Sequence, residues 1–131
     1  MDLTNSGSLF LNNTLTNRKE IFRSRKPGVV NIFTCGPSIY RRPHIGNYRT
    51  FVYEDILQKY LEYLGYQVNR VINFTDIEDK SISTASEEGV EVGQLTQSVE
   101  ETIFKEIDTL SIIFPTEIQR SSTSIETAVD I

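Results

Sequence analysis

Apolar residues recur at the spacing of an α-helix in two long stretches of the chain. In residues 51–64 they repeat every three or four positions, and Gly65 follows where such a helix is expected to end. A second apolar stripe covers about 92–110 and stops before Phe114-Pro115, since proline breaks a helix. A shorter helix is expected over about 76–89. The pattern therefore predicts three helices.

Two other stretches have the composition of β-strands. Residues 29–34 form a nearly continuous β-branched and aromatic run, which suits a strand covered on both faces, as in parallel sheets. The run ends at Cys35-Gly36-Pro37, which we expect to be a loop, and residues 67–74 form the second strand. Strand, helix and strand in this order predict a βαβ unit and hence a parallel α/β sheet.

The amino-terminal residues show a different pattern. Short extended segments at 9–11 and 14–22 flank Asn12-Asn13, and Lys26-Pro27-Gly28 forces a turn. These features predict a small hairpin that precedes the βαβ unit.

With 131 residues the chain is long enough for one domain and too short for two. We divide it into an amino-terminal extension with the hairpin, residues 1–28, and the βαβ unit with the following helices, residues 29–131. The pattern Thr123-x-x-Glu126 predicts the start of a helix, yet the chain stops at Ile131 only about one turn later. We therefore expect a truncated portion of a larger domain.

The composition is that of a soluble globular protein, with 38% hydrophobic and 24% charged residues. No stretch reaches the roughly 18 apolar residues of a membrane span, and the amino terminus lacks a signal region. We therefore expect a cytoplasmic protein with no membrane contact. One cysteine cannot form an internal disulfide, so Cys35 is a buried small hydrophobic residue, a reactive thiol or a metal ligand.

The net charge of −5 hides an uneven distribution. Residues 1–60 carry 9 Lys and Arg against 4 Asp and Glu, whereas residues 61–131 carry 4 against 14, so the halves have net charges of +5 and −10. The acidic half is typical of a solvated helical surface. The basic half is able to attract phosphates, although scattered basic residues are weak support for nucleic-acid binding.

The segment Pro43-His44-Ile45-Gly46-Asn47 opens the first long helix after the first strand. This order places it at the carboxyl edge of a parallel sheet, where α/β proteins bind ligands. The amide groups at a helix amino terminus attract phosphate, Gly46 allows a ligand close to the backbone, and His44 and Asn47 add donors. The segment indicates a nucleotide site, although a lone histidine in a loop is more often structural.

Several longer motifs surround this segment. They are Asn13-Thr14-Leu15-Thr16, Thr34-Cys35-Gly36-Pro37-Ser38-Ile39-Tyr40, Arg49-Thr50-Phe51, Tyr60-Leu61-Glu62-Tyr63-Leu64-Gly65-Tyr66 and Asn73-Phe74-Thr75-Asp76-Ile77-Glu78-Asp79-Lys80. In order and spacing they resemble the amino-terminal part of the catalytic domain of the cysteinyl-tRNA synthetase family, which belongs to the class I aminoacyl-tRNA synthetases. The segment from His44 to Asn47 is similar to the first class I signature, with Asn47 in place of its final histidine. The resemblance implies the first half of a Rossmann-like parallel α/β sheet.

The same resemblance implies ATP-dependent activation of L-cysteine to cysteinyl adenylate and its transfer to tRNA(Cys), assisted by Mg²⁺. The reacting carboxylate is already ionised at pH 7, so the site has to stabilise charge and needs no general base. His44 and Asn47 are the implied catalytic residues, and they bind ATP together with Gly46 and Thr50. The positions implied to contact substrate cysteine are Gly36 and Thr75. Further positions expected to line the site are Tyr40 and Arg49.

Cys35 matches the first zinc ligand of the family. A zinc ion with an open coordination position binds the thiolate of substrate cysteine, which separates cysteine from serine. The remaining ligands are implied to lie beyond residue 131, so this chain cannot complete the site. An independent Mg²⁺ site at Asp76, Glu78 and Asp79 is a weaker alternative, because acids in the first turn of a helix commonly complement its dipole.

Two other functions stay open. A ligase that joins activated cysteine to an amino sugar, as in mycothiol biosynthesis, shares the Cys-Gly, His-x-Gly and Thr-Asp motifs. A truncated paralogue would bind nucleotides without catalysis, and we expect this chain alone to be inactive because half of the sheet is missing. A half-built sheet also predicts an unpaired strand edge, exposed apolar surface and self-association.

Overall fold

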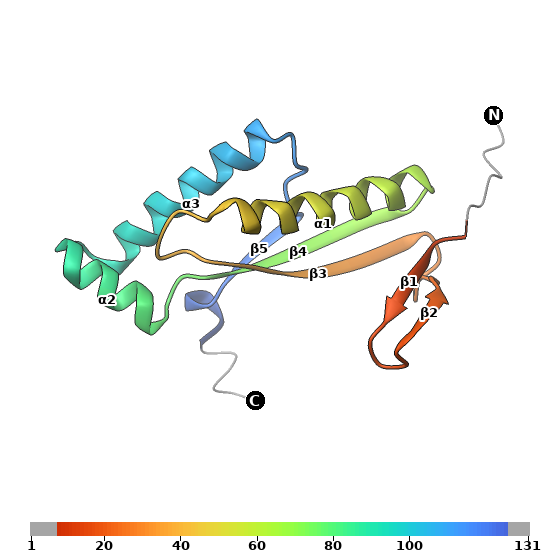
Figure 1. Ribbon diagram of the computed structural model, residues 1–131, viewed down its shortest axis with the longest axis horizontal. Helices are drawn as coiled ribbons and strands as arrows, with labels where there is room; N and C mark the ends of the chain where they lie inside the picture. Colours follow the sequence, from red (N-terminus) through yellow and green to blue (C-terminus); the bar gives the residue numbers. More distant parts are fainter. Residues whose placement is uncertain (1–7, 126–131) are drawn as a thin grey trace.

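The computed structural model describes residues 8–125, which form a three-stranded sheet with helices and a separate two-stranded hairpin (Figure 1). The strands are β1 (Phe10–Asn13), β2 (Arg18–Ile21), β3 (Val29–Ser38), β4 (Gln67–Thr75) and β5 (Glu117–Arg120). The helices are α1 (Ile45–Tyr63), α2 (Asp79–Glu88) and α3 (Val92–Thr109), followed by the 3-10 turn η1 (Ser122–Ser124). No helix within this described range is long and apolar enough to cross a membrane.

The strand order of the larger sheet is β3-β4-β5, and both strand pairs are parallel. α1 connects β3 to β4, and α1 and α3 cover the same face of the sheet (Figure 1). The predicted βαβ unit and parallel α/β sheet are therefore confirmed.

The core lies between this covered face and the two helices. Ile72 and Phe74 of β4 pack with Phe51 of α1 and Ile103 of α3, and each of these side chains is at most 4% exposed. Burying one such side chain stabilises the fold by about 1.5–3 kcal/mol. The ring of Phe104 extends the cluster, with its centroid 6.3 Å from that of Phe74. This packing fixes α1 relative to the sheet.

The predicted helices are confirmed, with changes at their ends. α1 begins at Ile45, within the segment expected to open it, and Gly65 follows it with a φ of 91°, a left-handed conformation that favours glycine. α2 begins at Asp79 and not near residue 76. The reason is that the Asp76 carboxylate accepts a hydrogen bond from the Ser122 amide at 2.9 Å and so connects β4 to the turn after β5. Of the capping pair predicted at Thr123-x-x-Glu126, Glu126 lies outside the described residues.

The amino-terminal hairpin is also confirmed, but the expected position of its turn is wrong. Asn12 and Asn13 belong to β1, where they pair with Lys19 and Arg18 of β2. The turn covers residues 14–17, and Asn17 has a φ of 52°, a conformation that asparagine tolerates better than most residues.

β3 differs from the prediction in two ways. The expected loop at residues 35–37 is wrong, because β3 continues to Ser38, with a register shift between Cys35 and Ser38 where it pairs with β4. A Cβ atom on Gly36 would lie 1.8 Å from the Asn73 backbone oxygen, so only glycine allows this close approach. The expected cover on both faces is also wrong, since Phe33 is 66% exposed. The uncovered sheet face, which includes Asn31, Phe33 and Cys35, is called the open face below.

Candidate functional site

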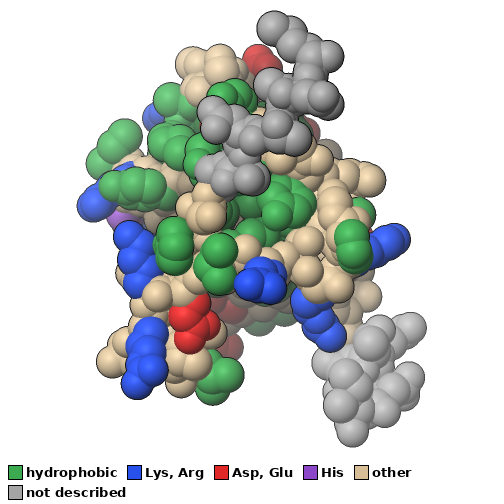
Figure 2. All heavy atoms as spheres, turned by 90° about the vertical axis from the view of Figure 1, so that its right-hand side faces the viewer, with side chains coloured by type: hydrophobic (Ala, Val, Ile, Leu, Met, Phe, Trp, Pro, Cys, Tyr) green, Lys and Arg blue, Asp and Glu red, His purple; other side chains and the backbone are tan. Residues whose placement is uncertain are grey.

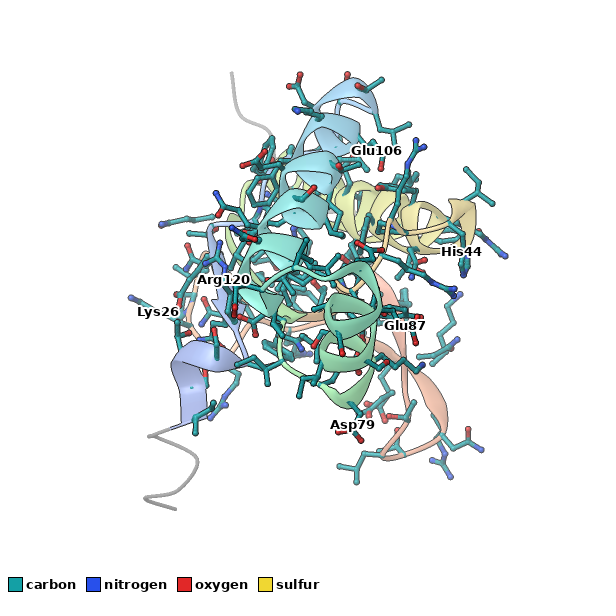
Figure 3. All side chains as sticks on the ribbon, turned by 90° about the vertical axis from the view of Figure 1, so that its left-hand side faces the viewer. Lys26, His44, Asp79, Glu87, Glu106 and Arg120 are labelled. Carbon is teal, nitrogen blue, oxygen red and sulfur yellow. The ribbon has the colours of Figure 1, made fainter. Side chains whose placement is uncertain are left out.

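A pocket of about 200 Å³ lies where β3 leaves the sheet and α1 begins. It is the carboxyl edge of the parallel strands, which Figure 3 shows from the front, with His44 at the start of α1. The side chains that line it include Ser38, Tyr40, Arg41, Arg42, His44, Asn47 and Lys80. The structure thus brings the predicted residues His44 and Asn47 together in one pocket.

His44 is the amino-terminal cap of α1. Its Nδ1 atom accepts a hydrogen bond from the Gly46 amide at 3.0 Å, while its own amide donates to Oδ1 of Asn47 at 3.2 Å. Because Nδ1 is an acceptor, the neutral imidazole carries its proton on Nε2. The reciprocal cap therefore leaves two donors for a ligand, Nε2 of His44 and Nδ2 of Asn47.

Gly46 makes this arrangement possible. A Cβ atom on residue 46 would lie 2.7 Å from Cε1 and 2.9 Å from Nδ1 of His44, which is too close for any larger residue without movement of the ring. The role of Gly46 in the structure is thus to leave room for the imidazole.

Two cations of the pocket approach the ring of Tyr40. The guanidinium carbon of Arg41 lies 5.1 Å from the ring centroid, and Nζ of Lys80 lies 5.5 Å from it. Such cation–π contacts contribute about 0.5–1 kcal/mol at exposed sites. Neither cation forms an ion pair with another residue of the described range, so both charges remain for an anion.

Arg42 is different because its charge is compensated. Its Nε atom donates to Oε1 of Glu106 on α3 at 2.6 Å, and the hydroxyl of the buried Tyr48 donates to the other oxygen of the same carboxylate. The Tyr48 and Arg42 hydrogen bonds hold the pKa of Glu106 below its ordinary value, and burial and Glu106 raise the pKa of Tyr48 well above its own. This contact fixes the loop before α1 to α3, and Figure 3 shows Glu106 beside the start of α1.

Other predicted site residues lie outside the pocket. Thr50 is exposed one turn along α1, where its hydroxyl donates to the Gly46 carbonyl oxygen at 3.4 Å. Gly36 donates its amide to Oδ1 of Asn73 at 3.2 Å, and Thr75 ends β4, where its carbonyl oxygen accepts from the Ile39 amide at 3.0 Å. Gly36 and Thr75 thus belong to the same edge of the sheet as His44 without lining its pocket.

Cys35 is exposed on the open face and makes one weak contact, from its Sγ to the Gly36 carbonyl oxygen at 3.7 Å. Within residues 8–125 no group of three or more His, Cys, Asp and Glu side chains gathers around one point. The donor set present is a single accessible thiol. One such ligand fits a zinc site only if the other ligands come from elsewhere.

The acidic residues after β4 lie before α2 or in its first turn. Asp76 binds the amide of Ser122, Glu78 is the amino-terminal cap of α2, and Asp79 lies in the first turn of that helix. Such carboxylates stabilise a helix amino terminus.

The sequence did not place Arg41, Lys80 and Glu106 in the site, although Arg41 is one of the basic residues expected to attract phosphates. The signal for Lys80 was its position at the end of the last resembling motif, and the signal for Arg41 was its place two residues before Pro43. Neither position reveals that the two side chains meet at Tyr40.

Fold and pocket together define a class: a parallel α/β half-domain with a cationic pocket at the switch from its first strand to its first helix. The family model of the tRNA synthetases class I (C) catalytic domain matches residues 21–131. The chain therefore belongs to the family of these class I tRNA synthetase catalytic domains.

Individual relatives agree with this family. The chain is 40% identical over 119 residues to a cysteine–tRNA ligase of Methanosarcina mazei, covering 91% of this chain and 25% of the relative. It is 49% identical over 89 residues to a cysteine–tRNA ligase of Limosilactobacillus reuteri, covering 68% and 19%, and 43% identical over 104 residues to one of Chlamydia pneumoniae, covering 79% and 22%. The chain spans a quarter or less of the length of these relatives.

Proposed function

We propose that this chain is the amino-terminal part of the catalytic domain of a cysteine–tRNA ligase that acts in the cytoplasm. The intact enzyme would activate L-cysteine with ATP and transfer it to tRNA(Cys). The 40% identity to a relative of that name over 91% of this chain supports this choice of reaction.

The observation that carries the proposal is the set of donors and cations in the pocket at His44. Its Nε2 and the Asn47 amide are free to donate because the capping contacts use the other polar atoms of both side chains. Arg41 and Lys80 add two uncompensated positive charges. Donors and cations at a helix amino terminus fit the phosphates of ATP.

In the proposed reaction the carboxylate of cysteine attacks the α-phosphate and pyrophosphate leaves. Negative charge increases on the phosphate oxygens, and fixed donors stabilise it without having to reorganise. His44 and Asn47 are held in place by their reciprocal cap, and Tyr40 holds the two cations. Mg²⁺ would accompany the phosphates and neutralise part of their charge.

We propose that Cys35 supplies one ligand of a zinc ion whose other ligands belong to the rest of the enzyme. When bound, zinc would supply a soft acceptor that prefers the thiolate of cysteine to the hydroxyl of serine. The exposure of the thiol supports this role. Gly36 and Thr75, at the same edge, would contact the substrate cysteine.

Cysteine-dependent exchange of pyrophosphate into ATP tests the proposal in the intact protein that contains this chain. His44→Ala is expected to lower the exchange rate about 10²-fold or more with little change in the KM for cysteine, because the lost contact stabilises the transition state. Ile45→Ala is the matched control, since this neighbouring side chain is 84% exposed and lies outside the pocket. An unchanged rate in His44→Ala would remove His44 from the catalytic residues. Formation of a product in which cysteine is joined to an amino sugar would show that the acceptor is the amino sugar and not tRNA.

A further inference from the structure

The hairpin and the segment after it carry a run of basic residues. The segment from residue 18 to residue 26 contains five basic side chains, all of them exposed: Arg18, Lys19, Arg23, Arg25 and Lys26. None of them forms an ion pair within the part of the chain that the structure describes. Figure 2 looks on to this end of the molecule and shows Lys and Arg side chains over the face that carries the hairpin.

The one acidic residue of this segment is bound within the hairpin. The carboxylate of Glu20 accepts hydrogen bonds from Nδ2 of Asn13 at 3.0 Å and from Oγ1 of Thr16 at 2.6 Å. These two bonds hold the pKa of Glu20 below its ordinary value. Glu20 therefore orders the turn and does not pair with the basic side chains.

A polar hollow of about 250 Å³ lies at the turn of the hairpin. The side chains that line it are Asn12, Asn13, Thr14, Asn17, Arg18 and Lys19. Amide, hydroxyl and cationic groups of this kind make most protein contacts to the phosphates and sugars of nucleic acids. The hollow thus combines charge with hydrogen-bonding groups that suit a hydrated polyanion.

The hairpin that carries the basic side chains is held in place by contacts of Phe22. The Phe22 amide donates to the Leu9 carbonyl oxygen at 2.7 Å, and the Phe22 ring meets that of Tyr66 edge to face, with centroids 6.0 Å apart. The hydrogen bond closes the hairpin at its open end, and the ring contact attaches the hairpin to the connection between α1 and β4. The hairpin lies at the end of the sheet opposite the pocket of His44 (Figure 1), so the two surfaces are separate.

We propose that this hairpin surface, defined as Arg18, Lys19, Arg23, Arg25 and Lys26 with the hollow at the turn, binds the phosphodiester backbone of RNA. That the RNA is the tRNA of the aminoacylation reaction rests on the proposed function. Positive charge on this surface and negative charge on α2 and α3 orient the chain with the hairpin toward a polyanion. An anionic membrane is a poorer partner, because insertion of the exposed Leu15 at the turn would bury the amides of the neighbouring asparagines.

The test measures the Kd of the 131-residue chain for unfractionated tRNA over a series of salt concentrations. Lys19→Gln is expected to raise the Kd several-fold, whereas the matched control Lys105→Gln, which removes an exposed lysine from α3, leaves it unchanged. The triple variant Arg18→Gln, Lys19→Gln, Arg23→Gln is expected to raise the Kd about tenfold or more and to reduce the salt slope by about 2 to 3, because each lost phosphate contact lowers it by about 1. Circular dichroism establishes that each variant keeps its fold.

Three results would overturn the proposal: no binding of tRNA at low salt, equal losses in Lys19→Gln and Lys105→Gln, or binding to phosphatidylserine vesicles that tRNA does not compete away. RNA binding is measured without ATP, and pyrophosphate exchange is measured without RNA. If pyrophosphate exchange occurs but the chain does not bind RNA, only the proposal for the hairpin surface is wrong. If the chain binds RNA but cysteine-dependent exchange does not occur, only the proposed function is wrong.

Discussion

The imidazole of His44 occupies the space that a Cβ atom of residue 46 would need. Such an atom would lie 2.7 Å from Cε1 of the ring, and the Nδ1 beside it accepts the Gly46 amide at 3.0 Å. The glycine thus determines where Nε2 of His44 points, and the two residues act as one unit.

Gly46→Ala is therefore expected to lower activity while it changes stability little. Alanine inside a helix is about 1 kcal/mol more favourable than glycine, and loss of the amino-terminal cap costs about 1 kcal/mol, so the two effects offset each other. In the proposed reaction His44 binds the phosphates, which the displaced ring would no longer reach, so we expect pyrophosphate exchange in the intact protein to fall about tenfold to 10²-fold.

Gly93→Ala is the matched control, because Gly93 is the second residue of α3 as Gly46 is of α1, and no atom lies within 4 Å of its added Cβ. It should raise the melting temperature and leave exchange unchanged. Equal exchange rates in both variants would contradict the coupling of Gly46 to His44.

Much of the fold follows from local sequence patterns. The apolar periodicity and Gly65 locate α1, the stripe after residue 92 locates α3, and the β-branched run locates β3. Each of these elements buries one continuous face, so the spacing of its apolar residues can be recognised within a short stretch of sequence.

Other features depend on contacts that a local pattern does not contain. β5 has four residues and no apolar run, and it exists because it pairs in parallel with β4. Arg70 is 2% exposed in the middle of β4, with its guanidinium 3.5 Å from the carboxylate of Glu54 on α1. Burial lowers the pKa of Arg70 and raises that of Glu54. No pattern in the sequence predicts that these two residues form a pair.

The candidate site likewise has one part that the sequence predicts and one part that it does not. His44, Gly46 and Asn47 are adjacent in the sequence, and their segment predicts the capped helix start that the structure contains. The meeting of Lys80 and Arg41 at Tyr40 depends on how α2 follows β4, which no spacing in the sequence reveals.

Tyr48→Phe is expected to destabilise the chain in a pH-dependent way. The variant removes a hydrogen bond to the Glu106 carboxylate, which costs about 1–2 kcal/mol at pH 7. Since the pKa of Glu106 is lowered in the folded state, chiefly by Tyr48, this stability is present above the ordinary value of 4.5 and is lost as the pH falls through the folded pKa. Urea unfolding at several pH values should therefore show that the free energies of unfolding of Tyr48→Phe and of the chain without substitutions become equal at acidic pH.

Tyr53→Phe is the control for this series, because Tyr53 lies on the same helix and is 60% exposed. It should change the free energy of unfolding little at any pH. A Tyr48→Phe deficit that stays constant from neutral to acidic pH would show that Glu106 is not the partner responsible.

Phe33→Gln is expected to reduce self-association of the isolated chain. Phe33 lies 66% exposed on the open face, opposite Val71 in the strand register, and β3 has an outer edge that no strand within residues 8–125 pairs with. Exposed apolar surface beside an unpaired edge favours association between copies. Sedimentation velocity should show a smaller associated fraction for Phe33→Gln than for the control Tyr63→Gln, whose side chain is 79% exposed on α1. If the chain without substitutions is monomeric, the expected self-association is wrong.

Cys35→Ser distinguishes a metal ligand from a residue that only fills space on β3. The described part of the chain gathers no other group of ligands around this thiol, so the isolated chain should bind zinc weakly and a chelator should not lower its melting temperature. In the intact protein the serine hydroxyl is a poorer ligand than the thiolate, and we expect both the zinc content and the preference for cysteine over serine to fall. Zinc content measured by elemental analysis gives a readout that does not depend on activity. If zinc content and cysteine preference are both unchanged in Cys35→Ser, the thiol is no zinc ligand, and the discrimination between cysteine and serine must come from other residues.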